Sequence, residues 1–257
     1  MKKILLTSII LFFLVFEGVA QNTDSLINLG KELLDKGSVY FDESYLIEAE
    51  QKFQEVLIQD DYNYIAQYFL AYTYYRLAVF YLINRDDEQF KNYIKLSETE
   101  LGTILDSSNT NAEALSLLAS DYGEEIRANN NLAAKLAPKA LLLISKALKN
   151  DPDNPRVQLL AGKLILTLPE KFGGNKVKSL VHLKKSVKLF EENQDADDLL
   201  GWGYIFALSW LGINYAELND YVSAVSVYNK ALEVEPDFAW INNILLPDAQ
   251  KKLNTDD

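Results

Sequence analysis

The 257-residue sequence contains no cysteine and only one histidine, His182. Without cysteine the chain forms no disulfide, has no thiol nucleophile and cannot hold a zinc ion through sulfur. A lone histidine acts as a catalytic base only beside a nucleophile or carboxylate, and the sequence shows no such pattern around it. The sequence therefore favours a non-catalytic protein without a cofactor; an unrecognised carboxylate pair is the alternative.

Acidic residues occur in pairs near the ends of expected helices. Examples are Asp60-Asp61, Asp86-Asp87 and Glu124-Glu125. None has the spacing of a calcium-binding loop, so no metal site is expected there. We expect these pairs to lie on the solvated surface.

Basic residues are fewer than acidic ones, with 25 Lys and Arg against 37 Asp and Glu and a formal net charge of −12. Nucleic acids and anionic membranes are bound mainly through Lys and Arg. The acidic balance therefore argues against nucleic acid as a partner. Apolar residues make up 49% of the chain, which argues against disorder and predicts a sizeable core.

The first twenty residues, MKKILLTSIILFFLVFEGVA, place two lysines before an apolar run and small residues at Gly18 and Ala20. This order is typical of a secretory signal peptide with cleavage after Ala20. The apolar run, Ile4 to Phe16, is shorter than the ~20 residues of a membrane-spanning helix. We expect a periplasmic or secreted protein with no stable membrane span after cleavage; an uncleaved anchor is the alternative.

A spaced pattern of apolar and small residues occupies the C-terminal part. It comprises Leu208, Leu211, Gly212, Tyr215, Ala224, Tyr228, Ala231 and Pro236. These residues fall at the spacings of the tetratricopeptide pattern, with Leu208 in place of its tryptophan. On this evidence the chain resembles the tetratricopeptide repeat (TPR) family. The resemblance implies an all-α fold, an antiparallel helix-hairpin solenoid whose paired helices cross at Gly212 and Ala224.

Weaker copies of the second-helix half of the pattern begin at four earlier small residues, Ala49, Ser97, Ala140 and Ser179. With Ala224 they predict about five units in residues 21–257, following the signal peptide at 1–20. The units are longer than the ~34 residues of a standard repeat, so extra residues must lie between the two helices of a unit or lengthen them. The segment after Pro236 is expected to form a C-terminal capping helix.

The stretch LPEKFGGNKVKSLVHL, residues 168–183, has features of both a phosphate-binding loop and a turn. It lacks the spacing of the phosphate-binding motif, and no strand is expected before it. Pro169 ends a helix, Gly173 and Gly174 are expected to take positive φ, and Asn175 is expected to cap the next helix. The stretch is therefore predicted to be a turn, with His182 pointing to solvent.

The TPR resemblance implies that the first helix of each unit lines a concave groove. On this register six residues point into the groove: Tyr68, Tyr72, Tyr75, Arg76, Arg156 and Lys163. Tyrosine rings beside an arginine are common in interface hot spots, so the groove is expected to bind a protein or peptide. The alternative is that the tyrosines are core, because residues 62–83 are aromatic nearly all round and a helix apolar on every side is usually buried.

The predicted function is an exported, non-catalytic scaffold that binds a protein or peptide in its concave groove. The alternative is a ligand-binding or oligomeric accessory component of a periplasmic transport system. Residues 173–190 and 239–253 weakly resemble the periplasmic T component of TRAP-type transporters. On that alternative the chain would form a homo-oligomer around a pore.

Overall fold

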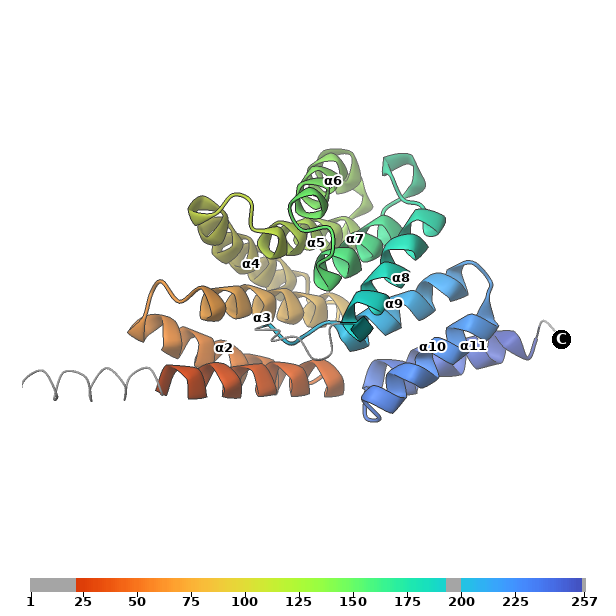
Figure 1. Cartoon of the computed structure of the whole chain (residues 1–257), viewed down its shortest axis with the longest axis horizontal. Helices are drawn as coiled ribbons and strands as arrows, with labels where there is room; N and C mark the ends of the chain where they lie inside the picture. Colours follow the sequence, from red (N-terminus) through yellow and green to blue (C-terminus); the bar gives the residue numbers. More distant parts are fainter. Residues whose placement is uncertain (1–21, 193–199, 256–257) are drawn as a thin grey trace, which may run out of the picture.

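The computed structural model describes residues 22–192 and 200–255. The signal peptide and cleavage site expected from the sequence lie outside these residues. The described part contains no β-strand, and its helices pack in successive antiparallel pairs (Figure 1). The fold is a TPR-like helical solenoid, which confirms the fold predicted from the sequence.

Five successive helix pairs make up the described part. The first pair is a helix over residues 22–40 with α2 (Glu43–Gln59). The others are α3 (Tyr64–Ile83) with α4 (Asp87–Ser107), α5 (Ala112–Ala128) with α6 (Ala133–Asn150), α7 (Pro155–Thr167) with α8 (Lys176–Glu192), and α9 (Tyr204–Glu217) with α10 (Tyr221–Val234). A π-helical turn, η3 (Ile241–Leu245), leads into the last helix, α11 (Leu246–Leu253).

Asparagine side chains fix the start of three first helices. The side-chain oxygens of Asn63, Asn111 and Asn154 accept backbone N–H groups in the first turns of α3, α5 and α7. Such a cap satisfies one of the free donors at a helix start. The second helices of three pairs begin instead at capping aspartates, Asp42, Asp86 and Asp220.

Small residues lie where the two helices of each pair cross. The five small residues predicted from the repeat pattern, Ala49, Ser97, Ala140, Ser179 and Ala224, are all fully buried. On the partner helix of the last pair, a Cβ at Gly212 would lie 2.2 Å from the ring of Tyr228. Larger side chains would hold the backbones apart, so the crossings depend on these residues.

The extra length of the units takes two forms. In the second pair it lengthens the helices, since α3 has 20 residues and α4 has 21. In the third and fourth pairs it forms short 3-10 turns between the helices, η1 (Asn130–Leu132) and η2 (Glu170–Phe172). Both forms match the expectation that the insertions lie between or within the helices of a unit.

The stretch at residues 168–183 is a turn between α7 and α8, as predicted. Gly173 has a φ of 107°, and the Asn175 side chain accepts the N–H of Lys178 at 2.8 Å. Gly174 does not take positive φ, which corrects the expectation. It is required for another reason, because a Cβ there would lie 1.9 Å from the carbonyl oxygen of Leu168.

The expectation that His182 points to solvent is wrong. The ring is half-buried between α7 and α8, with Nδ1 2.7 Å from the side-chain oxygen of Gln158. Burial, and secondarily the charge of Lys185, lower the pKa of His182. The histidine thus contributes to packing within the fourth pair.

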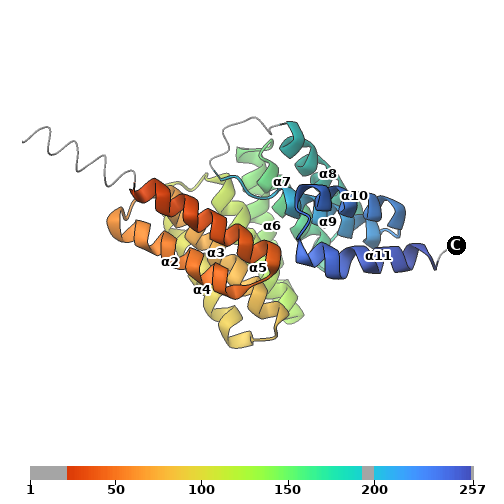
Figure 2. The ribbon, with the colours of Figure 1, turned by 90° about the horizontal axis from the view of Figure 1, so that it is seen from below.

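The first helix and the segment after α10 approach each other, although the described chain begins and ends on opposite sides of the molecule (Figure 1). The C-terminal end of the helix over residues 22–40 lies beside the segment that leads into α11, in both Figure 1 and Figure 2. Across residues 22–192 and 200–255, no helix combines the length and the apolar character that a membrane crossing requires.

Candidate functional site

A cavity of about 500 Å³ opens on the face that the first helices of the pairs form. Helices α3, α5, α7 and α9 supply its floor. Residues within 38–41, at the end of the first helix, and within 238–244, after α10, supply its sides. All three tryptophans of the sequence, Trp202, Trp210 and Trp240, line it. The cavity therefore exists because the end of the first helix and the segment after α10 approach each other over the floor helices.

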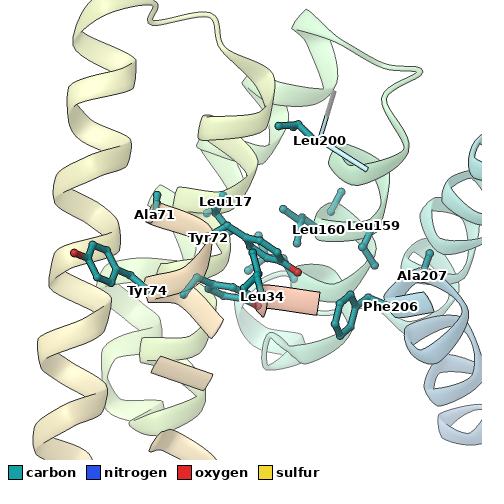
Figure 3. Close-up of a cluster of buried hydrophobic side chains, with 14 of the residues drawn as sticks. Leu34, Ala71, Tyr72, Tyr74, Leu117, Leu159, Leu160, Leu200, Phe206 and Ala207 are labelled. Carbon is teal, nitrogen blue, oxygen red and sulfur yellow. The ribbon is translucent and has the colours of Figure 1, made fainter. Parts of the chain in front are cut away.

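Aromatic rings form much of the cavity wall. Trp202 stacks on Tyr72 with ring centroids 4.0 Å apart, and Tyr72 stacks in turn on Tyr75 at 6.1 Å. Figure 3 shows Tyr72 directed towards Leu159, Leu160 and Phe206, while Tyr74 leaves α3 on the opposite side. Tyr74 was not among the groove residues expected from the sequence, and of those that were, Tyr72 and Tyr75 both line the cavity.

Four charged side chains line the cavity, the cations Arg76, Arg127 and Lys163 and the carboxylate of Glu124. Lys163 Nζ lies 2.5 Å from Glu124 Oε1 and also contacts the hydroxyl of Tyr75. Arg127 lies 2.6 Å from Glu124 Oε2. One carboxylate is thus shared by two cations, and the lining is net positive in a protein of negative net charge.

Burial and pairing compete at this cluster. Burial disfavours the ionised form of Glu124, but Lys163 and Arg127 outweigh it and hold the pKa of Glu124 below its ordinary value. Burial lowers the pKa of Lys163, and Glu124 opposes that shift. The cluster therefore contains a carboxylate that is firmly ionised and a lysine that loses its proton more readily than usual.

Arg76 differs from the other cavity cations. Its guanidinium lies over the ring of Phe206, 4.5 Å from the centroid, an arrangement that favours a cation. Within the described residues its buried Nε has no hydrogen-bond partner, and no carboxylate lies within ion-pair distance of it. Trp202 Nε1 is likewise buried without a hydrogen-bond partner among these residues.

A second polar cluster lies nearer the start of the same helices and is closed. Glu113 accepts hydrogen bonds from the Tyr68 hydroxyl at 3.1 Å, from Asn154 Nδ2 at 2.8 Å and from Arg156 Nε at 2.8 Å. Arg156 also donates to the carbonyl of Trp202 at 3.2 Å. All these groups are hydrogen-bonded within the protein, so we interpret the cluster as structural.

Four of the six groove residues expected from the sequence line the cavity: Tyr72, Tyr75, Arg76 and Lys163. The structure places Tyr68 and Arg156 outside the cavity, where both hydrogen-bond to Glu113 in the closed cluster. Both alternatives for the tyrosines therefore apply in part, with Tyr68 in the core and Tyr72 at the cavity. What these residues bind stays a prediction.

Several cavity residues were not expected from the sequence. Glu124 was expected on the surface, and this is wrong, because α5 lies between α3 and α7 and the side chain faces both. The spacing of Glu113 and Glu124 could have indicated this, because 11 residues are about three helical turns and place both glutamates on the same face of α5. Trp202 lies in the connection before α9, where helical periodicity gives no information.

No protein-family model and no curated protein matches the chain. Among solved structures, a thermophilic TPR protein from Thermus thermophilus is similar, with a TM-score of 0.63 and 17% identity over 90% of this chain and 98% of that one. The HusA haemophore from Porphyromonas gingivalis is similar with a TM-score of 0.53 and 20% identity, over 72% of this chain and 92% of that one. At these identities the likeness shows the fold alone.

In the described part of the chain no group of three or more His, Asp or Glu side chains is arranged to hold a metal ion. The cavity has the composition of a binding site, with apolar walls and a few convergent polar groups.

Proposed function

We propose that the protein is an exported, non-catalytic binding protein that encloses one flat, largely apolar ligand in the cavity. The cavity itself is the observation that carries this proposal, since it measures about 500 Å³ and all three tryptophans line it. Small-molecule sites span roughly 300–1,000 Å³ and are lined mainly by apolar and aromatic side chains. The half-buried rings of Trp210 and Trp240 offer flat contact faces with little conformational freedom to lose.

The shape of the face favours a compact ligand over an extended peptide. An extended chain rises roughly 3.3 Å per residue and needs a continuous groove. Trp202 lies across Tyr72, and the Glu113 cluster fills the neighbouring part of the same face. The cavity is therefore a compact space between residues 38–41 and residues 238–244, which suits a compact ligand.

The similarity to a haemophore supplies a specific ligand class to test. A haem is flat and apolar over most of its area and carries two carboxylate groups, which suits aromatic walls and a positive lining. The only histidine of the chain, His182, packs between α7 and α8 and does not line the cavity. Recognition would therefore rest on the ring and its carboxylates, without a histidine ligand to the iron.

A protein or peptide partner is the second candidate, and the TPR-like fold favours it. A partner could insert an aromatic residue at its chain end into the cavity, with the terminal carboxylate near Arg76. The proposal that the protein is exported rests on the sequence of residues 1–20, which is typical of a signal peptide. Membership of a periplasmic transport system and assembly into a homo-oligomer also stay predictions.

Tryptophan fluorescence tests the proposal directly, because every tryptophan of the chain reports on the cavity. Titration of the purified protein with haemin should give saturable quenching at one ligand per chain. Tyr72→Ala should weaken binding by about tenfold or more, since it removes the buried ring on which the cavity residue Trp202 stacks. Tyr62→Ala is the matched control, because that ring is 89% exposed and lies outside the lining.

Two outcomes would count against haem. Quenching that never saturates, and that is equal in both variants, would mean that haemin binds elsewhere. Quenching by a peptide with an aromatic C-terminal residue, but not by haemin, would favour the second candidate.

A further inference from the structure

We infer that the ligand carries an anionic oxygen group that Arg76 receives, so that the cavity selects amphipathic acids over neutral compounds of the same shape. This inference rests on the proposed function, because it concerns the same cavity. It adds the chemical class of the ligand and the residue that recognises it.

The state of Arg76 is the first observation. Its Nε is buried without a hydrogen-bond partner in the described part of the chain, although a buried donor left unpaired is costly. The ring of Phe206 holds the guanidinium in place at 4.5 Å without using its N–H groups. A guanidinium presents a planar fork that matches the two oxygens of a carboxylate.

The charge around Arg76 is the second observation. Lys163 and Arg127 already share Glu124, so that carboxylate is not available to Arg76. Burial and the charge of Glu235 raise the pKa of Asp35; the charge of Arg76 opposes this shift only in part, and the two groups form no ion pair. The cavity therefore retains a positive charge that no described side chain neutralises directly.

Arg156 in the closed cluster gives a comparison for Arg76, because its guanidinium is hydrogen-bonded within the protein. Arg156 donates to Glu113 at 2.8 Å and to the carbonyl of Trp202 at 3.2 Å. Arg76 lacks such contacts within the described residues, and at the cavity it is accompanied by a second unpaired donor, Trp202 Nε1. Two residues that line the cavity thus each carry a buried donor without a partner among the described residues, which favours a ligand that brings a hydrogen-bond acceptor.

A pair of fluorescent probes separates charge from shape. Anilinonaphthalene sulfonate is anionic, and N-phenylnaphthylamine has nearly the same rings without the sulfonate. We expect the wild-type protein to bind both, the sulfonate more tightly, with an affinity that falls as salt is raised. Arg76→Gln should weaken sulfonate binding by about tenfold or more and leave the neutral probe within about twofold. Lys91→Gln, an exposed cation on α4, should change neither.

Each outcome decides one point. Equal binding of both probes by the wild type, unchanged in Arg76→Gln, would overturn the inference and leave the cavity as a binding site for neutral ligands. Failure of both probes to bind would contradict the proposed function itself. If Arg76→Gln proves unfolded by circular dichroism, the preference of the wild type for the sulfonate and its salt dependence decide the matter. A neutral probe that binds as tightly as the sulfonate at low salt would then overturn the inference.

Discussion

Two polar clusters are built on glutamates of α5 that each pair with a cation of α7, but only one of the clusters lines the cavity. In one, Glu113 joins Tyr68 of α3 to Arg156 of α7; in the other, Glu124 joins Tyr75 to Lys163. The first is closed by Asn154 and holds the helices together, whereas the second opens on the cavity and shares Glu124 with Arg127. The comparison teaches that a buried ion pair becomes part of a candidate site only where the packing leaves space beside it.

Regular spacing places the two clusters one above the other. The tyrosines are seven residues apart on α3, the glutamates 11 on α5 and the cations seven on α7. At 3.6 residues per turn these spacings are close to two, three and two turns, so each set lies on one face of its helix. The three first helices therefore carry matched faces, and each cluster links all of them.

The closed cluster should be the more sensitive to loss of its carboxylate. Glu113→Ala would remove the carboxylate that lies 2.8 Å from the Nε of Arg156, a side chain that is only 5% exposed. Removing one member of a buried pair typically costs about 3–5 kcal/mol. We expect a loss of this size in the free energy of unfolding, measured by urea denaturation.

Glu48→Ala on α2 is the matched control, because that glutamate is exposed, and it should change stability by less than about 0.5 kcal/mol. A Glu113→Ala protein as stable as the control would show that the closed cluster does not hold α3, α5 and α7 together.

The open cluster should tolerate the equivalent change better. Glu124→Ala removes the partner of Lys163, but burial already lowers the pKa of Lys163, and the adjacent cavity gives water access. We expect a loss of about 1–3 kcal/mol by the same denaturation measurement. A loss equal to or larger than that of Glu113→Ala would contradict the distinction between the clusters.

A third buried carboxylate on α5 forms no ion pair within the described part of the chain and sharpens the comparison. Asp121 accepts a hydrogen bond from Ser97 at 2.8 Å, and burial raises its pKa well above the ordinary value. A raised pKa means that the folded state favours the protonated form, so this group lowers stability as pH rises above about 4.

Asp121→Asn should therefore stabilise the protein at pH 7 and have little effect near pH 3.5, and it should be the smallest of the three changes. Melting temperatures of the variant and the wild type across this pH range would measure it. A gain that is largest at low pH would have the wrong sign for a protonated Asp121.

Local pattern predicted the fold, the crossing residues and part of the cavity wall. The small residues from Ala49 to Ala224 could be recognised because each crossing imposes the same steric demand at a repeating position. Tyr72 and Arg76, which line the cavity, were among the groove positions that the TPR resemblance implies. The helix face on which a residue lies can be predicted in this way, because it depends only on the residue's position within its own helix.

The rest of the site depends on contacts between distant parts of the chain. The sequence around Glu124 does not show whether the side chain meets water or Lys163, 39 residues later. The sides of the cavity need residues 38–41 and 238–244 to meet across the floor, and no local pattern records that approach. Trp202 lies between helices, so no periodicity assigned it a face.

A crystal structure of the protein grown with haemin would test the central claim most directly, namely that the space between the first helix and the segment after α10 is a ligand site. The account predicts one porphyrin in the cavity, with its ring against the walls formed by Trp202, Trp210 and Trp240 and a carboxylate at Arg76. A porphyrin bound only on the outer surface, with the cavity empty, would contradict it.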